Sequence, residues 1–164
     1  MLVEKINKQY DATLILAELE QFEKKYCWSE IKPLASSFAV TSRDGTTTDG
    51  NKPFIGDETE FKMLELYNGS YISQVINDLN ISYGRIRFLK LKPGYIMKIH
   101  YDPSVRYHIP ITTNLHCGFL DEELYSYTMP ELGRLYKLNA TNFHTAFNCS
   151  RHEDRIHLVI VEAY

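Results

Sequence analysis

From about residue 80 onward, the chain consists of short apolar segments separated by residues that favour turns. The segments are rich in β-branched and aromatic side chains, and Gly, Pro and Asn lie between them. This pattern predicts many short antiparallel strands, arranged as a sandwich or barrel. The expected strands cover residues 83–92, 95–101, 105–113, 117–124, 133–138, 145–148 and 155–163.

The first 80 residues show a different pattern, which indicates helices. Leu16, Leu19 and Phe22 recur at helical spacing with Leu14, and charged residues occupy the positions between them. The expected elements are a helix over residues 11–26, a strand over 36–41 and short helices over 58–67 and 71–79. We therefore expect one domain, residues 1–164, with a helical part (1–80) packed on a β-rich part (81–164).

Charge and cysteine usage narrow the class of protein. The net charge of −3 lacks the basic excess of a nucleic-acid-binding protein. No segment has the apolar length of a membrane span or a signal peptide. The three cysteines, Cys27, Cys117 and Cys149, have no metal-binding spacing and are interpreted as reduced thiols. These features predict a cytoplasmic protein without nucleic-acid or membrane partners.

The stretch from His100 to His108 contains a His-x-Asp pair and an Arg-x-His pair. On a strand, residues i and i+2 point to the same face, so His100 and Asp102 can converge on one point. Together they suggest part of a metal site, although Asp102 also begins a good turn sequence. All six histidines of the chain lie in the β-rich part, and the possible third ligands are His108, His116, His144, His152 and His157.

His144 is followed eleven residues later by Arg155, which opens the apolar run 156–161. In a hairpin these two residues would lie on neighbouring strands at similar depth. An arginine at the start of a buried strand needs a partner, and its planar fork suits a carboxylate. Two histidines, one carboxylate and three open positions favour non-haem Fe(II). The nearby arginine would then hold the far carboxylate of 2-oxoglutarate.

Several other polar residues can be interpreted in two ways, as part of the site or as ordinary structural residues. Arg106 and His108 either belong to the site or lie on an exposed strand face. His157 shares a face with Arg155 and fits best as a core histidine hydrogen-bonded to a neighbour. Arg43, in a polar loop over residues 43–51, either selects substrate at the site mouth or is part of an ordinary turn. His116 and His152 lie in expected loops and fit solvated side chains.

Six motifs follow one another in the β-rich part. They are Leu91-Lys92-Pro93-Gly94, His100-x-Asp102, Arg106-x-His108-Ile109-Pro110-Ile111, Gly133-x-x-Tyr136-x-Leu138-Asn139, His144-x-x-x-Asn148 and Arg155-Ile156-His157-Leu158-Val159. In this order they resemble the aspartyl/asparaginyl β-hydroxylase family of Fe(II)/2-oxoglutarate oxygenases. The resemblance covers about residues 83 to 163, and it implies a double-stranded β-helix, that is, a jelly-roll or cupin-like fold.

The resemblance implies a role for each matching residue. His100, Asp102 and His144 would be the catalytic iron ligands, and Arg155 would bind the distal carboxylate of 2-oxoglutarate. Arg106 and His108 match a second basic pair, expected near the other carboxylate of the co-substrate or near the prime substrate. Asn148 or Tyr136 would contact the iron ligands without binding the iron.

One departure from the family pattern is informative. The vertebrate peptide hydroxylases of the family lack the acidic ligand, so Asp102 makes this chain more similar to the small bacterial members, which include free-proline hydroxylases. The strand before Pro93-Gly94 offers no clear hydroxyl partner for Arg155.

The resemblance implies a hydroxylase that acts on an amino-acid side chain, free or in a peptide, with O2 as second co-substrate. A different class is a cupin-like metal-binding sensor or ligand-binding module, because His/Asp/His sites also accept zinc or manganese. A third is an interaction protein that keeps the fold with an inactive site.

Overall fold

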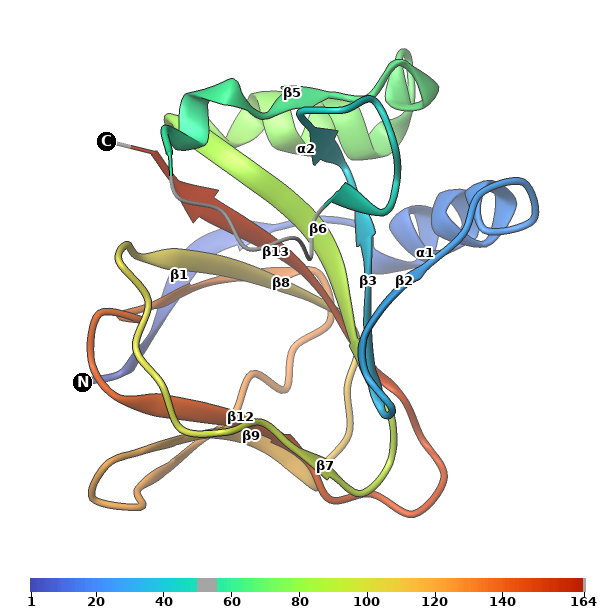
Figure 1. Ribbon diagram of the computed structural model, residues 1–164. Helices are drawn as coiled ribbons and strands as arrows, with labels where there is room; N and C mark the ends of the chain where they lie inside the picture. Colours follow the sequence, from blue (N-terminus) through green and yellow to red (C-terminus); the bar gives the residue numbers. More distant parts are fainter. Residues whose placement is uncertain (50–55, 164) are drawn as a thin grey trace.

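The computed structural model describes residues 1–49 and 56–163 and consists mainly of two β-sheets that face each other (Figure 1). In the described part of the chain, the large sheet has seven strands and the small sheet has four. The large sheet contains, in spatial order, β1 (Val3–Gln9), β11 (Arg134–Leu138), β8 (Arg106–Thr112), β13 (Arg155–Glu162), β6 (Tyr83–Leu91), β3 (Ala35–Ala39) and β2 (Ser29–Lys32). The small sheet contains β10 (Ser126–Tyr127), β9 (Cys117–Asp121), β12 (His144–Asn148) and β7 (Tyr95–Ile96).

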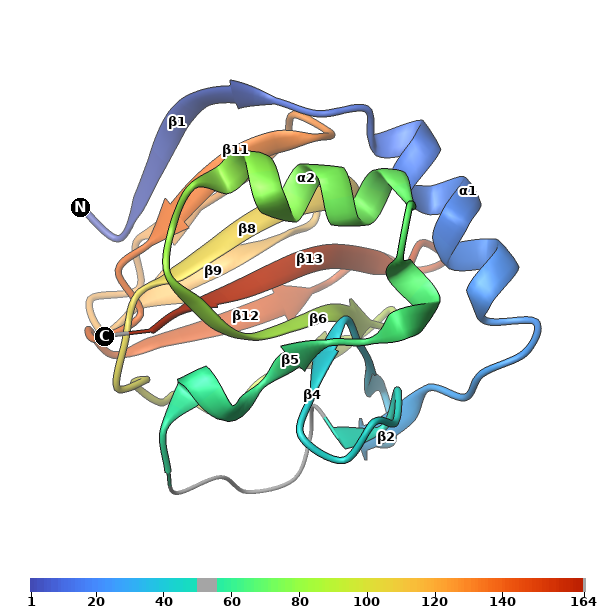
Figure 2. The same ribbon diagram turned by 90° about the horizontal axis from the view of Figure 1, so that it is seen from above.

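Two helices cover the face of the large sheet that points away from the small sheet, as Figure 2 shows from above. The helix α1 (Ala12–Phe22) begins at Asp11, whose carboxylate accepts hydrogen bonds from two backbone N–H groups of the first turn. The helix α2 (Tyr71–Leu79) begins at Ser70 and ends at Asn80, which adopts the left-handed conformation with φ 53°. At the end of α1, the backbone N–H of Glu23 donates to the Leu19 carbonyl.

The central strands of the large sheet alternate between two apolar layers. On β13, Leu158 and Ile160 pack against the helices, whereas Val159 packs between the two sheets. Because both faces are covered, β13 is buried along nearly its whole length. The face of β13 that carries Val159 also carries Arg155 and His157, which is how the fold brings polar groups into the space between the sheets.

Most predicted elements of the β-rich part are present, with shifted ends. The segment expected as a strand over 95–101 forms a regular strand only at Tyr95–Ile96, and then follows β12 irregularly to a single bridge between His100 and His144. The expected hairpin that joins His144 to Arg155 is wrong. β12 lies in the small sheet and β13 in the large one, so the two residues come from opposite sheets.

The N-terminal part differs more from the prediction. The first helix spans 12–22 instead of 11–26, and Leu14, expected on its apolar face, is exposed. Instead of one helix over 58–67 there are two 3₁₀ turns, Glu58–Glu60 and Glu65–Tyr67, around the short strand β5 (Lys62–Met63). β5 pairs with β4 (Thr41–Ser42).

Three strands of this region, β1, β2 and β3, join the large sheet, and only β3 was expected. The turn expected at Gly50-Asn51 lies outside the described residues. No helix among the residues described has the length and apolar character needed to cross a membrane.

Candidate metal centre

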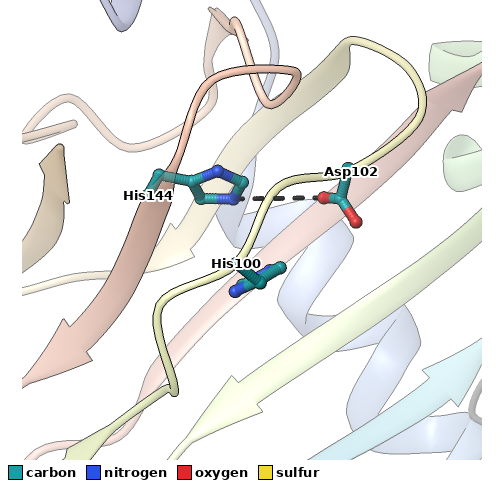
Figure 3. Close-up of side chains that lie close together, drawn as sticks. All are labelled: His100, Asp102 and His144. Carbon is teal, nitrogen blue, oxygen red and sulfur yellow. Dashed lines mark ion pairs between the residues drawn. The ribbon is translucent and has the colours of Figure 1, made fainter. Parts of the chain in front are cut away.

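The side chains of His100, Asp102 and His144 lie close together (Figure 3). His100 and Asp102 belong to the segment that links β7 to β8, and His144 is the first residue of β12. One ligand atom from each residue lies within 4.8 Å of the others. Paired backbone hydrogen bonds of 2.9 and 2.8 Å between His100 and His144 hold the two histidines side by side.

Backbone carbonyls fix the orientation of both imidazole rings. The Nδ1 of His100 lies 2.8 Å from the Lys98 carbonyl oxygen, and the Nδ1 of His144 lies 2.9 Å from that of Asn142. A carbonyl can only accept, so each Nδ1 carries the proton and each Nε2 keeps its lone pair. This arrangement prepares neutral histidines to ligate a metal through Nε2.

Asp102 is held by Arg106, which the sequence had suggested for a contact with co-substrate or substrate. The guanidinium binds the carboxylate in a bidentate manner: Nη2 lies 3.0 Å from Oδ1, and Nε lies 3.1 Å from Oδ2. Burial alone would raise the pKa of Asp102, but Arg106 and the two histidines bring it below its ordinary value. The carboxylate is therefore ionised and ready to bind a cation.

Electrostatics also favour the metal-binding form of His144. Burial lowers the pKa of its imidazole, although the hydrogen bond to Asn142 and the nearby Asp102 act in the opposite direction. The Nε2 of His144 lies 4.0 Å from the Asp102 carboxylate, the contact drawn as a dashed line in Figure 3. A neutral imidazole beside an ionised carboxylate is the state that a divalent metal requires of its ligands.

The three residues open onto a cavity between the sheets. Its walls are mainly apolar, and its polar lining comprises the three residues of the candidate centre together with four basic side chains. The basic residues are Arg87, Arg106, His108 and Arg155. The apolar residues are Leu89, Met97, Phe119, Leu138, Ala146 and Val159.

Arg155 is fully buried at the start of β13, and its guanidinium reaches this cavity. It lies over the ring of Phe119, with 4.8 Å from the guanidinium carbon to the ring centroid. Its Nη2 lies 3.2 Å from the Nδ1 of His157. Among the described residues, Nε and Nη1 have no hydrogen-bond partner, and no carboxylate forms an ion pair with this side chain. Burial lowers the pKa of Arg155 to about 10, which leaves it charged at neutral pH.

His108 and His157 complete a buried polar group beside Arg155. The Nδ1 atoms of the two rings are 3.4 Å apart, and His108 packs edge-on against Phe119. Burial lowers the pKa of both histidines well below the ordinary value, and the charge of Arg155 adds to the effect. Both rings are therefore neutral. The alternative in which Arg106 and His108 lie on an exposed strand face is wrong, because both are buried.

The other polar residues singled out in the sequence lie elsewhere. Arg43 pairs with Asp49 at 2.9 Å, stacks on Phe61 and does not line the metal cavity. His116 and His152 are exposed and line a separate surface pocket. Asn148 is buried and donates to the Leu91 and Glu153 carbonyls, which fixes the connection between β12 and β13.

Tyr136 also lies outside the cavity lining. It is buried on β11, where its hydroxyl accepts a hydrogen bond from the backbone N–H of Glu131. Neither Asn148 nor Tyr136 therefore contacts the candidate centre from within the cavity.

Sequence reasoning missed Arg87 and Phe119 as cavity residues. Burial lowers the pKa of Arg87 to about 9, and the neighbouring charges of Arg85 and Arg106 add to this. The alternation of Arg85, Arg87 and Leu89 on β6 was the available signal, since residues two apart share a strand face. Phe119 lies on β9 in the opposite sheet, and its place could be found only from the pairing of the sheets.

The fold and the site together define a jelly-roll protein of the kind seen in 2-oxoglutarate/Fe(II) oxygenases, with a His/Asp/His centre between its sheets. Residues 69–162 match the model of the aspartyl/asparaginyl beta-hydroxylase family. The chain belongs to this family.

Solved structures of low sequence identity share the fold. A prolyl-4-hydroxylase from Pseudomonas putida superimposes with a TM-score of 0.58 at 12% identity, over 99% of this chain and 92% of that one. A 2OG-Fe(II) oxygenase family oxidoreductase from Burkholderia pseudomallei gives 0.58 at 10% identity, over 90% and 77%. The viral collagen prolyl hydroxylase of Paramecium Bursaria Chlorella virus-1, in complex with 2OG, gives 0.54 at 12% identity, over 98% and 95%. No curated protein matches the chain in sequence.

Proposed function

We propose that this protein is an Fe(II)/2-oxoglutarate-dependent dioxygenase that hydroxylates an amino-acid side chain, free or carried on a peptide. One observation carries the proposal. A group of three metal-ligating residues and a buried guanidinium with two unpartnered nitrogens line the same cavity. The triad suits a metal, and the guanidinium suits a carboxylate.

The donor set of the triad fits iron. Two imidazoles and one carboxylate with open positions are the usual ligands of non-haem Fe(II) oxygenases. His100, Asp102 and His144 would hold the ion through the atoms that the carbonyl contacts and Arg106 leave available. When bound, Fe(II) supplies the oxidising chemistry with O2 and 2-oxoglutarate, so that a C–H bond becomes C–OH while succinate and CO2 form.

Arg155 would bind the distal carboxylate of 2-oxoglutarate. A buried cation is costly unless it is paired, and the described residues provide no anion for it. The apolar side chains of Leu89, Phe119 and Val159 line the same cavity, and an apolar surrounding strengthens the pairing. A bare metal sensor would have no use for such a guanidinium, which argues against the sensor alternative.

Arg106 and His108 line the same cavity, which supports the prediction that they also face the co-substrate or the prime substrate. Arg106 also forms an ion pair with Asp102. The family membership and the structural likeness to proteins named as prolyl hydroxylases support a side chain of an amino acid or peptide as the prime substrate.

We also propose that residues 1–164 act as a single domain in the cytoplasm. Strands from the first 80 residues and from the rest of the chain share one sheet, which supports the single domain. The three cysteines form no disulfide, which agrees with a reducing compartment.

The test of the proposed function is a turnover screen. The protein is incubated with Fe(II), 2-oxoglutarate and O2 and with individual free amino acids or short peptides, while succinate and the mass of each candidate substrate are measured. We expect at least one substrate to gain one oxygen atom in proportion to the succinate formed. Neither succinate nor an oxygen gain with any compound, in protein shown to bind iron, would contradict the proposal.

A further inference from the structure

The side chain of His157 makes the only hydrogen bond to the Arg155 guanidinium among the described residues. The two residues are i and i+2 on β13, so both point into the space between the sheets. Their partners across the β6 strand are Leu91 and Leu89, which have no polar group to offer. His157 is therefore the polar neighbour of Arg155. The strand before Pro93-Gly94 offers no clear hydroxyl partner that could take this place.

The chemistry of the contact fixes the state of the ring. A guanidinium has donors and no acceptor, so the Nη2 of Arg155 donates and the Nδ1 of His157 accepts. His157 is therefore neutral, with its proton on Nε2. Burial holds the pKa of this imidazole well below its usual range, which agrees with the neutral form.

His108 reinforces the same arrangement. Its Nδ1 lies 3.4 Å from the Nδ1 of His157, an atom that already accepts from Arg155. Two lone pairs do not face each other at this distance, so the Nδ1 of His108 carries a proton and points it at His157. The ring of His157 thus lies between Arg155 and His108, and each of them limits its rotation.

The guanidinium is consequently held at two places, by His157 at Nη2 and by the Phe119 ring against its face. These contacts leave Nε and Nη1 unpartnered among the residues that the structure describes. Nη1 carries two N–H groups at the tip of the side chain, and a carboxylate oxygen can accept from them.

We propose that His157 is a positioning residue that holds Arg155 so that the unpartnered Nη1 meets the distal carboxylate of the co-substrate. This inference rests on the proposed function. His157 does not touch the co-substrate itself. Its effect is to select 2-oxo acids with a second carboxylate over those without one.

The experiment compares two 2-oxo acids that differ in this one group. Anaerobic protein with Fe(II) is titrated with 2-oxoglutarate and with 2-oxovalerate, which has the same carbon chain but no distal carboxylate. The visible absorption of the iron chelate reports binding of each. The variants are His157→Leu, which removes the acceptor, and His157→Asn, whose Oδ1 can take the place of Nδ1. His116→Leu, at an exposed histidine outside the cavity, is the matched control.

We expect His157→Leu to weaken 2-oxoglutarate binding about tenfold or more, the scale of one hydrogen bond to a charged group. Binding of 2-oxovalerate should stay as in the wild type, and His157→Asn should recover most of the lost affinity. If His157→Leu does not fold, His157→Met provides the same comparison.

Two results would overturn the inference alone. One is that wild type and His157→Leu prefer 2-oxoglutarate over 2-oxovalerate by the same factor. The other is that the variant loses both acids equally, as general damage to the cavity would cause. A wild type that binds neither acid would instead overturn the proposed function, and this inference with it.

Discussion

At the residue scale, the site depends on a few buried polar contacts that prepare each group for its role. Backbone carbonyls set the tautomers of His100 and His144, and Arg106 keeps Asp102 ionised. The sequence predicted His100, Asp102, His144 and Arg155 because their motifs have characteristic spacing. It did not predict that Arg106 binds Asp102, because the partner of an arginine side chain depends on the fold.

The role of Arg155 leads to the first prediction. Arg155→Ala removes the cation and should weaken 2-oxoglutarate binding about 100-fold or more, the cost of truncating one partner of a buried charge pair. Affinity for the metal alone should change little, because Arg155 contacts none of the three candidate ligands. Isothermal titration of Mn(II), followed by 2-oxoglutarate, measures both. An unchanged co-substrate affinity would remove Arg155 from its proposed role.

The contact between Arg106 and Asp102 predicts a pH effect on metal binding. Arg106 holds the pKa of Asp102 below its usual value against the opposing effect of burial, so Arg106→Met should raise that pKa. A higher pKa means that more of the carboxyl group is protonated at low pH, where the proton competes with the metal. Relative to the wild type, the variant should therefore lose metal affinity as the pH falls from about 8 to about 5.5.

Mn(II) titrations of both proteins across that range test this prediction. The comparison is between the two pH profiles, so a uniform change in affinity does not affect it. Parallel profiles for wild type and variant would show that Arg106 does not control the ionisation of Asp102.

At the element scale, strands buried on both faces were predicted well and edge elements poorly. β13 is a long apolar run whose position the sequence shows directly. β1 was missed because it is an edge strand, largely exposed and rich in charged and polar residues, so it lacks the alternation of a half-buried strand. In the segment 58–67, expected as a helix, the buried residues Phe61, Leu64 and Tyr67 recur every three residues, a spacing that also fits 3₁₀ turns.

The turn that leads into β11 allows a test at this scale. Gly133 has φ +74°, and a Cβ there would lie 1.9 Å from the Tyr10 carbonyl oxygen. Gly94 has a similar φ of +77° but no atom within 4 Å of the added carbon. Gly94→Ala should cost about 1–2 kcal/mol for the left-handed conformation alone. Gly133→Ala should cost clearly more, because the backbone of Tyr10 must also move.

Urea denaturation of both variants measures the two losses in the free energy of unfolding. Equal losses at the two positions would mean that the segment after β1 does not approach Gly133 as closely as the structure indicates.

At the scale of the whole molecule, the sandwich brings together groups that the sequence separates. His144 and Phe119 come from the small sheet, whereas Arg155, His157 and His108 come from the large one. The sequence suggested a hairpin between His144 and Arg155 because the two segments follow each other closely. A short connection does not reveal whether the next strand pairs with the previous one or crosses to the opposite sheet, so this part of the site could not be predicted.

The central claim is that one cavity binds a divalent iron ion and a 2-oxo dicarboxylic acid together. The most direct measurement is the absorption spectrum of the wild-type protein with Fe(II) and 2-oxoglutarate in the absence of O2. We predict a visible charge-transfer band that requires both components and that disappears in His144→Ala. A protein that binds Fe(II) but gives no band with saturating 2-oxoglutarate would contradict the claim and favour a metal-binding module without oxygenase chemistry.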